Sequence, residues 1–262
     1  MSSVLLTRPQ LRSSGEDVIH TTLKGAGVIV LEIPMIRFEL PRETDDLDAV
    51  LVRASHGAYH AIVLSSPTAV YFFNERVREL GLLDAIRITA RFGAVGRATS
   101  DALELLGFEI SLPIPIHAGS HQLAAMLSAR DLTGKPILLL QSQIGLEILE
   151  HSLRELGAQP ERQTLYYTKG PSLGDAARLL HLLEGPSRPD VIAFFSPSAV
   201  SYFVTALAEM GAEHIRKLPA LATIGETTAK AVEETLRRRP EIVARKANQQ
   251  SLAEDILDYL AQ

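Results

Sequence analysis

The sequence predicts an α/β protein whose parallel strands alternate with helices. Two observations carry this prediction. Short apolar runs, such as Pro136–Leu140 (PILLL), alternate along the chain with helical patterns of about 10 to 15 residues. In addition, the stretch Ala61–Val70 (AIVLSSPTAV) is written a second time as Ile192–Val200 (IAFFSPSAV). In each copy an apolar run ends at Ser-Pro and gives way to a helical pattern, as when a buried strand leads into a helix capped by Ser.

A second pair of turns shows that the repeat extends beyond the Ser-Pro motif. Thirty residues separate Ser66 from Gly96 in the first copy, and 29 residues separate Ser196 from Gly225 in the second. Each glycine opens a helical pattern. Matching motifs at matching intervals indicate an internal duplication of one α/β unit.

Bulk properties limit the class of protein. A chain of 262 residues with 46% hydrophobic residues has room for two domains of about 100 to 150 residues. The net charge of −5 does not favour binding to nucleic acid or an anionic membrane, which requires a clustered basic face. The chain has no cysteine, no signal-like start and no apolar run near the roughly 18 residues that span a bilayer. We therefore expect a soluble protein, and a cytoplasmic location is compatible with these features.

The chain order divides into two similar series of elements. The acidic segment Pro41–Asp48 is expected to connect two bodies, and Ile33–Leu40 and Gln163–Lys169 both alternate as strands with one wet face do. In addition to the two Ser-Pro strands, buried strands are expected at Val4–Leu6, Val28–Ile33, Phe108–Ile110 and Pro136–Leu140. Helices are expected at Ser13–Lys24, Val70–Leu80, Arg97–Leu106, His121–Ala129, Leu146–Leu156, Asp175–Leu183, Gly225–Arg238 and Gln249–Leu260. This alternation predicts two flavodoxin-like domains, each with a parallel sheet covered on both faces.

The Ser-Pro turns suit the binding of anions. Ser66 and Ser196 can cap their helices, and the hydroxyls of Thr68 and Ser198 follow two residues later. Unpaired N–H groups and the positive end of the helix dipole can hold a carboxylate or phosphate there without Lys or Arg. The alternative is that both serines serve only as helix caps.

The glycine turns provide a second candidate pair. Gly96–Thr99 (GRAT) and Gly225–Thr228 (GETT) each place glycine where the backbone bends closely and hydroxyls at a helix start, at Thr99 in one copy and at Thr227 and Thr228 in the other. Neither turn contains G-x-G-x-x-G, and the chain has no G-x-x-x-x-G-K-[ST]. Nucleotide cofactors are therefore not predicted.

Metal and hydrolase sites have weaker support. His56 with His60, and His117 with His121, have the helical spacing of zinc pairs, but no acid follows at a matching position. The acids Asp45, Asp46 and Asp48 are better explained as a solvated connection or helix start than as a cation site. Since G-x-S-x-G is also missing, we predict neither a metal site nor a serine hydrolase.

Tyr166 and Tyr167 lie in the second alternating stretch. Strand alternation points consecutive side chains to opposite faces, so one phenol is expected to face the space between the two bodies. The alternative is that the tyrosine ring covers an apolar patch while its hydroxyl meets water.

Six short motifs in this order resemble the uroporphyrinogen-III synthase family. They cover nearly the whole chain and are Thr7-Arg8-Pro9, Ser66–Val70, Val95–Thr99, Leu165–Thr168, Phe195–Val200 and Ile224–Ala229. The resemblance implies two α/β domains joined by a two-stranded antiparallel linker. Residues 1–33 with 171–262 would form the first domain, residues 46–160 the second, and residues 34–45 with 161–170 the linker.

The resemblance also implies a reaction. Hydroxymethylbilane, a linear tetrapyrrole with eight carboxylates, would lose its hydroxyl as water and close to uroporphyrinogen III with the last pyrrole ring inverted. This is a step in tetrapyrrole (haem) biosynthesis, and it uses no cofactor and no metal. The electron-rich pyrrole expels the hydroxyl, so the protein must chiefly hold the substrate in the geometry that favours inverted closure.

The resemblance assigns roles residue by residue. Tyr166 matches the family tyrosine of the cleft and would orient or protonate the leaving hydroxyl. The substrate-binding set would be Thr7, Arg8, Ser66, Thr68, Gly96, Thr99, Ser142, Ser196, Ser198, Gly225, Thr227 and Thr228. Many relatives carry a basic residue and glycine after the Pro136–Leu140 strand and an arginine shortly after, where this chain has Gln141-Ser142 and Leu146. Ser142, Gln143 and the following helix start would have to replace those cations with neutral donors.

Three functions are compared. The first is the synthase, a lyase expected to act as a cytoplasmic monomer and to receive its unstable substrate from the enzyme that makes it. The second is a noncatalytic two-lobed protein that closes on an anionic small molecule. The third, an unrelated α/β transferase, is disfavoured because phosphate-binding loops are missing.

Overall fold

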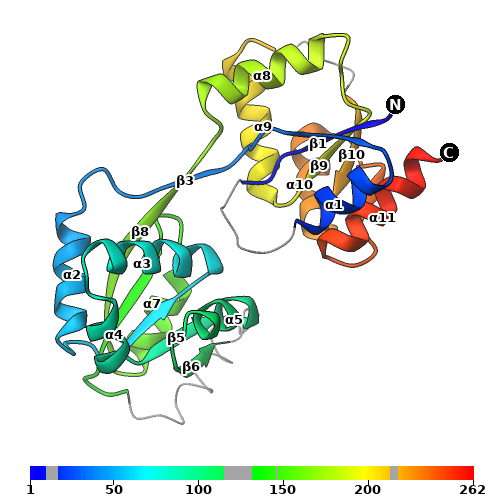
Figure 1. The fold of residues 1–262 in the computed structure, drawn as a ribbon. Helices are drawn as coiled ribbons and strands as arrows, with labels where there is room; N and C mark the ends of the chain where they lie inside the picture. The colour runs from blue at the N-terminus through cyan, green and yellow to red at the C-terminus, as the bar shows by residue number, and fades with distance from the viewer. Residues whose placement is uncertain (10–16, 115–131, 146, 213–217) are drawn as a thin grey trace. The chain divides into compact units, whose positions relative to one another are not determined.

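The computed structural model describes residues 1–9, 17–114, 132–145, 147–212 and 218–262. The chain divides into two units, Met1–Phe38 with Lys169–Gln262, and Glu39–Thr168. Figure 1 shows that the first unit combines the N-terminal segment with the yellow to red C-terminal segments, so both chain ends lie in it. The second unit is continuous in sequence.

The first unit is built on a parallel sheet with the strand order β11-β10-β9-β1-β2. Its strands are β1 (Ser3–Leu6), β2 (Ile29–Glu32), β9 (Val191–Phe194), β10 (Ala220–Thr223) and β11 (Ile242–Val243). Counted along this unit alone, the order is 2-1-3-4-5, which is the flavodoxin-like order. The predicted fold class is confirmed here.

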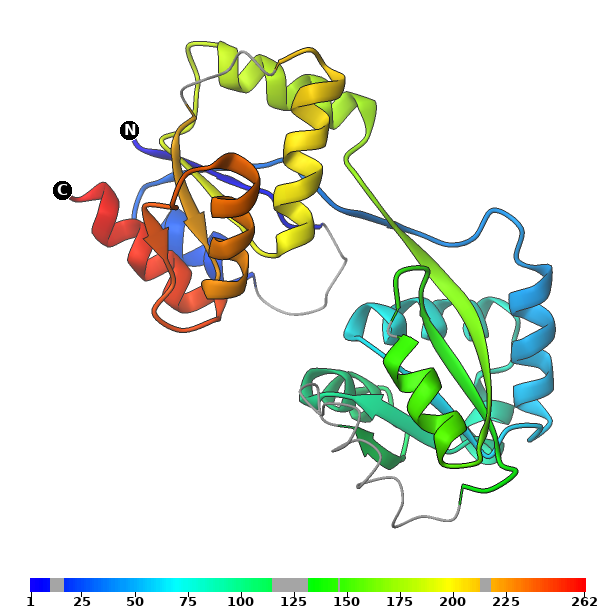
Figure 2. The same cartoon turned by 180° about the vertical axis from the view of Figure 1, so that it is seen from behind.

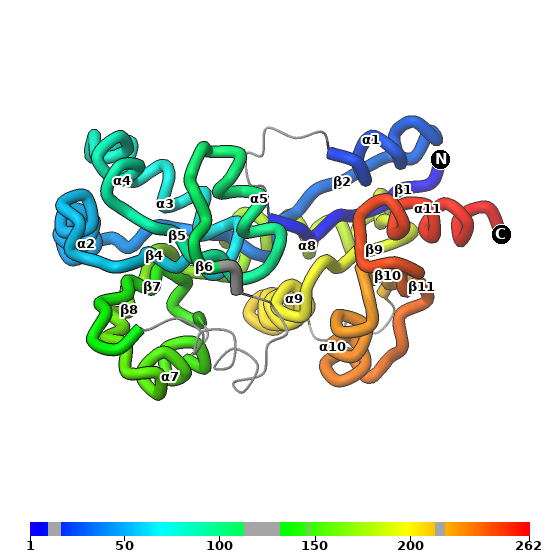
Figure 3. Tube along the Cα trace, turned by 90° about the horizontal axis from the view of Figure 1, so that it is seen from below, coloured from blue at the N-terminus to red at the C-terminus, as the bar shows by residue number. Residues whose placement is uncertain are grey.

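Helices cover both faces of this sheet. They are α1 (Val18–Gly25), α8 (Leu173–Glu184), α9 (Pro197–Glu209), α10 (Glu226–Leu236) and α11 (Gln249–Leu260). Leu5 packs in one core with side chains of α8, α9 and α10, whereas its neighbours Val4 and Leu6 pack in another core with α1 and α11. Figure 3 shows the same division, which follows from the alternation of side chains along a strand.

The second sheet has six strands in the order β3-β8-β7-β4-β5-β6, and all of it except Arg37 and Phe38 of β3 and Lys169 of β8 belongs to the second unit. The strands are β3 (Arg37–Glu39), β4 (Ala61–Leu64), β5 (Phe92–Val95), β6 (Ile110–Ile114), β7 (Pro136–Ser142) and β8 (Gln159–Lys169). From β8 to β6 every neighbouring pair is parallel. Without β3, this order repeats that of the first unit, with β7 in the place of β1 and β4 in the place of β9. The second unit is therefore a permuted copy of the first.

Helices also cover the second sheet. They are α2 (Asp45–Ser55), α3 (Pro67–Glu79), α4 (Leu83–Thr89), α5 (Arg97–Leu105) and α7 (Glu147–Glu155). Leu149 and Leu153 of α7 pack on Ile137 and Leu139 of β7, and Figure 2 shows α7 on that face of the sheet. Phe73 of α3 packs against Phe92 of β5, with ring centroids 5.6 Å apart.

Several predicted boundaries differ from the structure. The acids of the predicted connection Pro41–Asp48 begin α2, since carboxylates in a first turn interact favourably with the unpaired N–H groups. Helix α1 begins at Val18, where Asp17 accepts a hydrogen bond from the N–H of His20. Strand β8 begins at Gln159 because it pairs with β7 from Pro136 onward.

Two further predictions have different outcomes. Strand β6 begins at Ile110, where the predicted Phe108–Ile110 strand ended, because Ile110 pairs with Phe92. The helix predicted over His121–Ala129 lies outside the described residues. The alternating stretches Ile33–Leu40 and Gln163–Lys169 contain β3 and part of β8, which are neighbours in one sheet. Their antiparallel direction and the predicted domain boundaries stay predictions.

Arg76 fixes α2 against α3 through a two-pronged ion pair. Its Nε donates to Asp48 Oδ1 at 2.7 Å and its Nη2 to Asp48 Oδ2 at 2.5 Å. The same Nη2 also donates to Thr44 Oγ1 at 2.9 Å. The hydrogen bond from Arg76 lowers the pKa of Asp48, although burial works in the opposite direction.

We expect Asp48→Asn to lower the free energy of unfolding by about 1 kcal/mol at pH 7. Because the pKa of Asp48 is lowered in the folded state, its contribution is complete above the unfolded value of about 3.9 and is lost as the pH falls through the folded pKa. Urea unfolding at several pH values measures this. The difference between wild type and variant should shrink below about pH 4, and a constant difference would contradict the assignment.

Candidate active site

The two Ser-Pro turns have the same backbone geometry. Ser66 has φ −162° and ψ 160°, and Ser196 has φ −160° and ψ 157°. Each hydroxyl accepts a hydrogen bond from the main-chain N–H of the residue three positions later. Ser66 Oγ lies 3.1 Å from Ala69 N, and Ser196 Oγ lies 3.2 Å from Ala199 N. Both serines are therefore helix caps, and the predicted duplication is confirmed in three dimensions.

The two caps differ in their second neighbour. Ser196 Oγ lies 3.2 Å from Ser198 Oγ, which belongs to the same helix start. Ser66 Oγ instead lies 3.2 Å from the hydroxyl of Tyr166. Thr68, the counterpart of Ser198, is half-buried. In the second unit, the helix start of α3 is thus joined to a phenol from β8.

Tyr166 and Tyr167 have different surroundings. The side chain of Tyr166 is 6% exposed, whereas that of Tyr167 is 37% exposed. The ring of Tyr166 stacks on Phe72 of α3, with centroids 5.3 Å apart and planes 11° apart. Within its unit, Tyr166 is therefore the tyrosine that joins the Ser66 turn.

The end of β7 lies beside this turn, since β7 pairs with both β4 and β8. Ser142 is buried. Gln141 is 1% exposed, and its Nε2 has no hydrogen-bond partner among the described residues. An added Cβ at Gly145 would lie 2.2 Å from the amide carbon of Gln141, so only glycine leaves room for this side chain. Leaving this buried amide donor without an acceptor among the described residues costs stability.

The strand order of each sheet reverses at one point, between β7 and β4 and between β1 and β9. Ligands of open α/β sheets bind outside the carboxyl ends of strands at such a point. Ser142 and Ser66 lie at the carboxyl ends of β7 and β4, and Thr7 and Ser196 at those of β1 and β9. The predicted positions of these polar turns are confirmed for each unit. From the sequence we also predict that Ser66 and Ser196 face each other across a cleft spanned by the Tyr166 strand, and this stays a prediction.

The two glycine turns differ in what they require. Gly96 has φ +80°, a region that residues other than glycine rarely adopt. Gly225 has φ 172°, which is extended backbone open to any residue. An added Cβ at Gly225 would meet Ala247 Cβ at 3.4 Å. The expectation of a glycine-specific bend is therefore correct at Gly96 and wrong at Gly225.

Besides Ser142, three of the predicted hydroxyl ligands are buried. Thr7 Oγ1 donates to the carbonyl of Ala193 at 2.8 Å, and Thr99 Oγ1 donates to that of Val95 at 2.7 Å. Thr228 is 3% exposed, whereas Thr227 is exposed. Direct binding of substrate by Thr7, Thr99 and Thr228 stays a prediction.

Arg8 is surrounded by acids of its own unit. Its Nη2 forms ion pairs with Asp17 and, at 3.2 Å, with Glu32. Its guanidinium also lies 6.0 Å from the ring centre of Phe195. Arg8 is thus near the Ser196 turn, but its charge is balanced by two carboxylates.

A second cluster around a tyrosine lies near the amino ends of strands in the second sheet, opposite to the carboxyl ends where Ser66 and Ser142 lie. Tyr59 donates to Glu161 Oε2 at 2.6 Å, and Arg53 Nη2 contacts both Tyr59 Oη, at 2.7 Å, and Glu161 Oε1, at 2.5 Å. Burial, with help from Glu161, raises the pKa of Tyr59 to about 12. Tyr59 precedes β4, whereas Ser66 follows it, so this cluster is separate from the candidate site.

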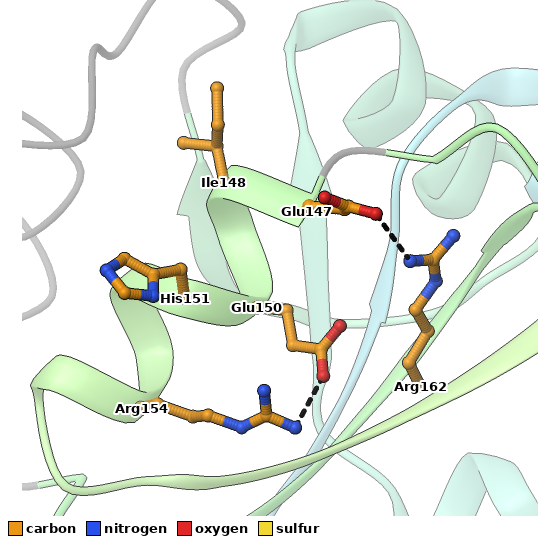
Figure 4. A pocket seen from close by; sticks show the side chains of 6 residues that line it. All are labelled: Glu147, Ile148, Glu150, His151, Arg154 and Arg162. Atoms are coloured by element: carbon orange, nitrogen blue, oxygen red, sulfur yellow. Dashed lines mark ion pairs between the residues drawn. The ribbon is translucent and has the colours of Figure 1, made fainter.

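A surface hollow of about 500 Å³ lies on α7 and β8 (Figure 4). Its charged side chains pair with one another, Arg154 with Glu150 at 2.6 Å and Arg162 with Glu147 at 4.0 Å. Paired charges leave little electrostatic attraction for an anionic ligand, so we do not assign this hollow as the site.

Among the described residues, no group of three or more His, Asp or Glu side chains is arranged to hold a metal ion. His56 Nδ1 lies 2.8 Å from the carbonyl of Val52 in its own helix. No described helix is long and apolar enough to cross a membrane.

Comparison with known families decides the assignment. A family model described as uroporphyrinogen-III synthase HemD matches residues 17–254. The chain belongs to the uroporphyrinogen-III synthase family. The resemblance predicted from six motifs is thereby confirmed, and the family match covers both units.

Individual members of the family agree with this assignment. The uroporphyrinogen-III synthase of Chlorobaculum parvum is 26% identical over 234 residues, which cover 89% of each chain. That of Proteus mirabilis is 28% identical over 157 residues, 60% of this chain and 75% of the relative. Crystal structures of a mutant synthase from Thermus thermophilus and of the Helicobacter pylori enzyme match with TM-scores of 0.63 and 0.62, at 18% and 16% identity. These matches cover at least 99% of each chain and show the shared two-domain α/β fold.

The sequence pattern did not indicate a role for Phe72, and it marked Gln141 only as a residue that takes the place of an expected cation. Phe72 belongs to the run Tyr71-Phe72-Phe73, of which Phe73 faces the core and Phe72 faces Tyr166. Helical periodicity from the buried Val70 and Phe73 could have placed Phe72 on a different face. The unsatisfied amide of Gln141 depends on tertiary packing, and no local pattern signals it.

Substitutions at Ser196 test whether the turn is only a cap. Asn and Asp cap helices about as well as Ser does, so both Ser196→Asn and Ser196→Asp should retain stability. If the turn binds a carboxylate, the added charge of Ser196→Asp should raise KM for hydroxymethylbilane about tenfold, whereas neutral Ser196→Asn should not. Urea unfolding and steady-state kinetics measure both effects. Equal KM for the two variants would leave the serine as a cap alone.

Proposed function

We propose that this chain converts hydroxymethylbilane into uroporphyrinogen III. The hydroxyl leaves as water and the macrocycle closes with the last pyrrole ring inverted. Family membership supports this reaction, and the observation that carries the proposed site is the 3.2 Å contact between the hydroxyls of Tyr166 and Ser66 at the start of α3. The hydro-lyase needs no oxidant or reductant, because its substrate and product differ by water alone.

Tyr166 is proposed as the catalytic residue. Its phenol would donate a hydrogen bond or proton to the departing hydroxyl while the electron-rich pyrrole supplies the electrons that break the carbon–oxygen bond. The carbon that closes the ring later releases one proton, so proton uptake and release balance. Ser66 accepts from Ala69 N, and its own hydroxyl hydrogen can point towards Tyr166 Oη.

The carboxylates of the substrate would be held mainly by neutral donors. Helix starts offer N–H groups and the positive end of the dipole. The proposed contacts are the exposed or half-buried hydroxyls Ser66, Thr68, Ser196, Ser198 and Thr227 with the amides around them. Such sites explain how a chain of net charge −5 binds an anion with eight carboxylates.

The domain arrangement forms part of the proposal. Two lobes, 1–33 with 171–262 and 46–160, would close around the substrate through the linker segments 34–45 and 161–170. The division of the chain into two units supports this organisation. The Ser66 and Ser196 turns would then approach opposite sides of one tetrapyrrole.

The surroundings of the enzyme follow from its substrate. We propose a cytoplasmic monomer that receives hydroxymethylbilane from the enzyme that makes it, since this substrate cyclises unaided to the uninverted isomer. A noncatalytic binding protein is not favoured, because both the family model and its named relatives are synthases.

The decisive assay is the isomer produced from hydroxymethylbilane. The wild-type protein should yield the inverted isomer faster than the uninverted one forms spontaneously. An isomer ratio identical to that of the protein-free reaction would overturn the proposed function and favour a binding role.

Tyr166→Phe should lower kcat about 100-fold if the phenol assists departure of the hydroxyl. Two control variants separate chemistry from packing. Tyr167→Phe changes an exposed phenol, and Tyr59→Phe changes a buried phenol near the amino ends of the strands, away from the candidate site. Both should turn over at close to the wild-type rate. Near wild-type turnover of folded Tyr166→Phe would remove this residue from the mechanism.

Gln141→Leu tests the unsatisfied amide. Because Nε2 is buried without an acceptor among the described residues, its removal should stabilise the free protein by about 1 to 3 kcal/mol. If the amide donates to the substrate, the same variant should show a raised KM. Thermal unfolding and kinetics together measure this exchange, and a gain in stability without any change in KM would show that Gln141 does not meet the substrate.

A further inference from the structure

The pairing of β7 with β8 changes register just before the catalytic tyrosine. Gln141 pairs with Thr164, but the next residue, Ser142, pairs with Tyr166. Leu165 is therefore an extra residue on β8. Such a bulge re-aims the side chains that follow it.

The bulge changes which faces the side chains occupy. Tyr166 stands opposite Ser142, where an unshifted register would place Leu165. Leu165 and Tyr166 are both buried, as expected in a sheet that helices cover on both faces. After the bulge, alternation resumes with Tyr167 exposed and Thr168 buried. The register at this point therefore decides which of two adjacent tyrosines enters the Ser66 turn.

The side chain of Gln143 continues the ladder beyond the end of β7. Its Nε2 donates to the carbonyl of Thr168 at 2.9 Å, and its Oε1 accepts from the N–H of Thr168 at 2.8 Å. The main-chain N–H of Gln143 also donates to the carbonyl of Tyr166 at 3.3 Å. Gln143 thus binds β8 on both sides of Tyr167.

Gln143 is itself held in place. Its carbonyl accepts a hydrogen bond from Arg162 Nη2 at 3.1 Å, which ties the turn after β7 back to β8. Both ends of the Gln143 amide are engaged, and only one orientation of that amide satisfies both contacts. Its donors and acceptors are therefore directed to β8 rather than to a substrate.

We propose that Gln143 is a positioning residue that fixes the register of β8 so that Tyr166, and not Tyr167, meets Ser66. This inference rests on the proposed function of Tyr166. A slip of one residue moves a strand's side chains to the opposite face, and a two-sided contact to one residue's main chain opposes such a slip. In this role Gln143 holds the main chain of β8, whereas the sequence resemblance would have it bind substrate in place of a missing cation.

Gln143→Met tests the proposal, because methionine keeps the length of the side chain and removes both hydrogen bonds. We expect kcat to fall about tenfold with KM little changed. Gln159→Met, at the exposed start of the same strand, is the matched control and should retain wild-type kinetics. Equal kcat for Gln143→Met and wild type would overturn the inference.

A double-mutant cycle distinguishes positioning from general destabilisation. If Gln143 acts through Tyr166, Gln143→Met should cost little further activity in a Tyr166→Phe background. Independent, additive losses would instead show a structural role unrelated to the tyrosine. If the wild-type protein gives no inverted isomer, the proposed function itself is wrong. If the wild-type protein gives the inverted isomer but the losses in the cycle are additive, only this inference is overturned.

Nitration of tyrosine provides a readout independent of activity. The chain has no cysteine, so tetranitromethane meets no competing thiol. In the wild-type protein, peptide mapping should show faster nitration of Tyr167 than of Tyr166, in line with their exposures. Gln143→Met should reduce this difference, and an unchanged ratio would overturn the positioning role.

Discussion

The hydrogen-bonding requirement of a helix start organises both units of this protein. A helix that follows a buried strand directly begins with unpaired N–H groups, and a side-chain oxygen must satisfy one of them. Ser66 and Ser196 do so with nearly identical dihedral angles. Because the carboxyl ends of parallel strands all lie on the same side of a sheet, the capped turns that follow neighbouring strands lie close together where the strand order reverses. The helix starts that these caps stabilise are the same helix starts that the proposed function uses to bind carboxylates.

The second unit adds a phenol to this arrangement. Tyr166 is buried against Phe72, yet its hydroxyl remains next to Ser66, so packing and hydrogen bonding fix the group from two directions. The pairing of β8 with β7 shifts by one residue at Leu165, and the amide of Gln143 bonds the main chain of Thr168 just beyond the two tyrosines. In the proposed function, this main-chain register would set the placement of the catalytic phenol, which Ser66 contacts directly.

Charge has a smaller part in the site than the substrate suggests. Arg8 is balanced by Asp17 and Glu32, and the end of β7 and the turn after it carry the uncharged residues Gln141, Ser142 and Gln143. Neutral donors remain, in particular the amide of Gln141, which no described residue satisfies. Neutral donors do not attract anions over long distances as a cation does, so in the proposed function recognition would depend on short contacts that form once the substrate is in place.

The sequence by itself determined the alternation of strands and helices, the duplication and the positions of the Ser-Pro caps. These features depend on local rules, namely apolar periodicity, Ser at a cap and Pro in the first turn. The motif order was sufficient to identify the family. Local rules also set the limits of prediction at Gly225, whose extended backbone does not need glycine, and at Thr7 and Thr99, whose hydroxyls turn into the fold.

Only the tertiary structure decided the permuted strand order of the second unit, which of Tyr166 and Tyr167 contacts Ser66, and the surroundings of Gln141 and Gln143. Alternation along β8 would have put the two tyrosines on opposite faces without saying which face meets Ser66. The bulge that answers this question exists only when β8 pairs with β7. It depends on hydrogen bonds between residues more than 20 positions apart, which no local sequence pattern encodes.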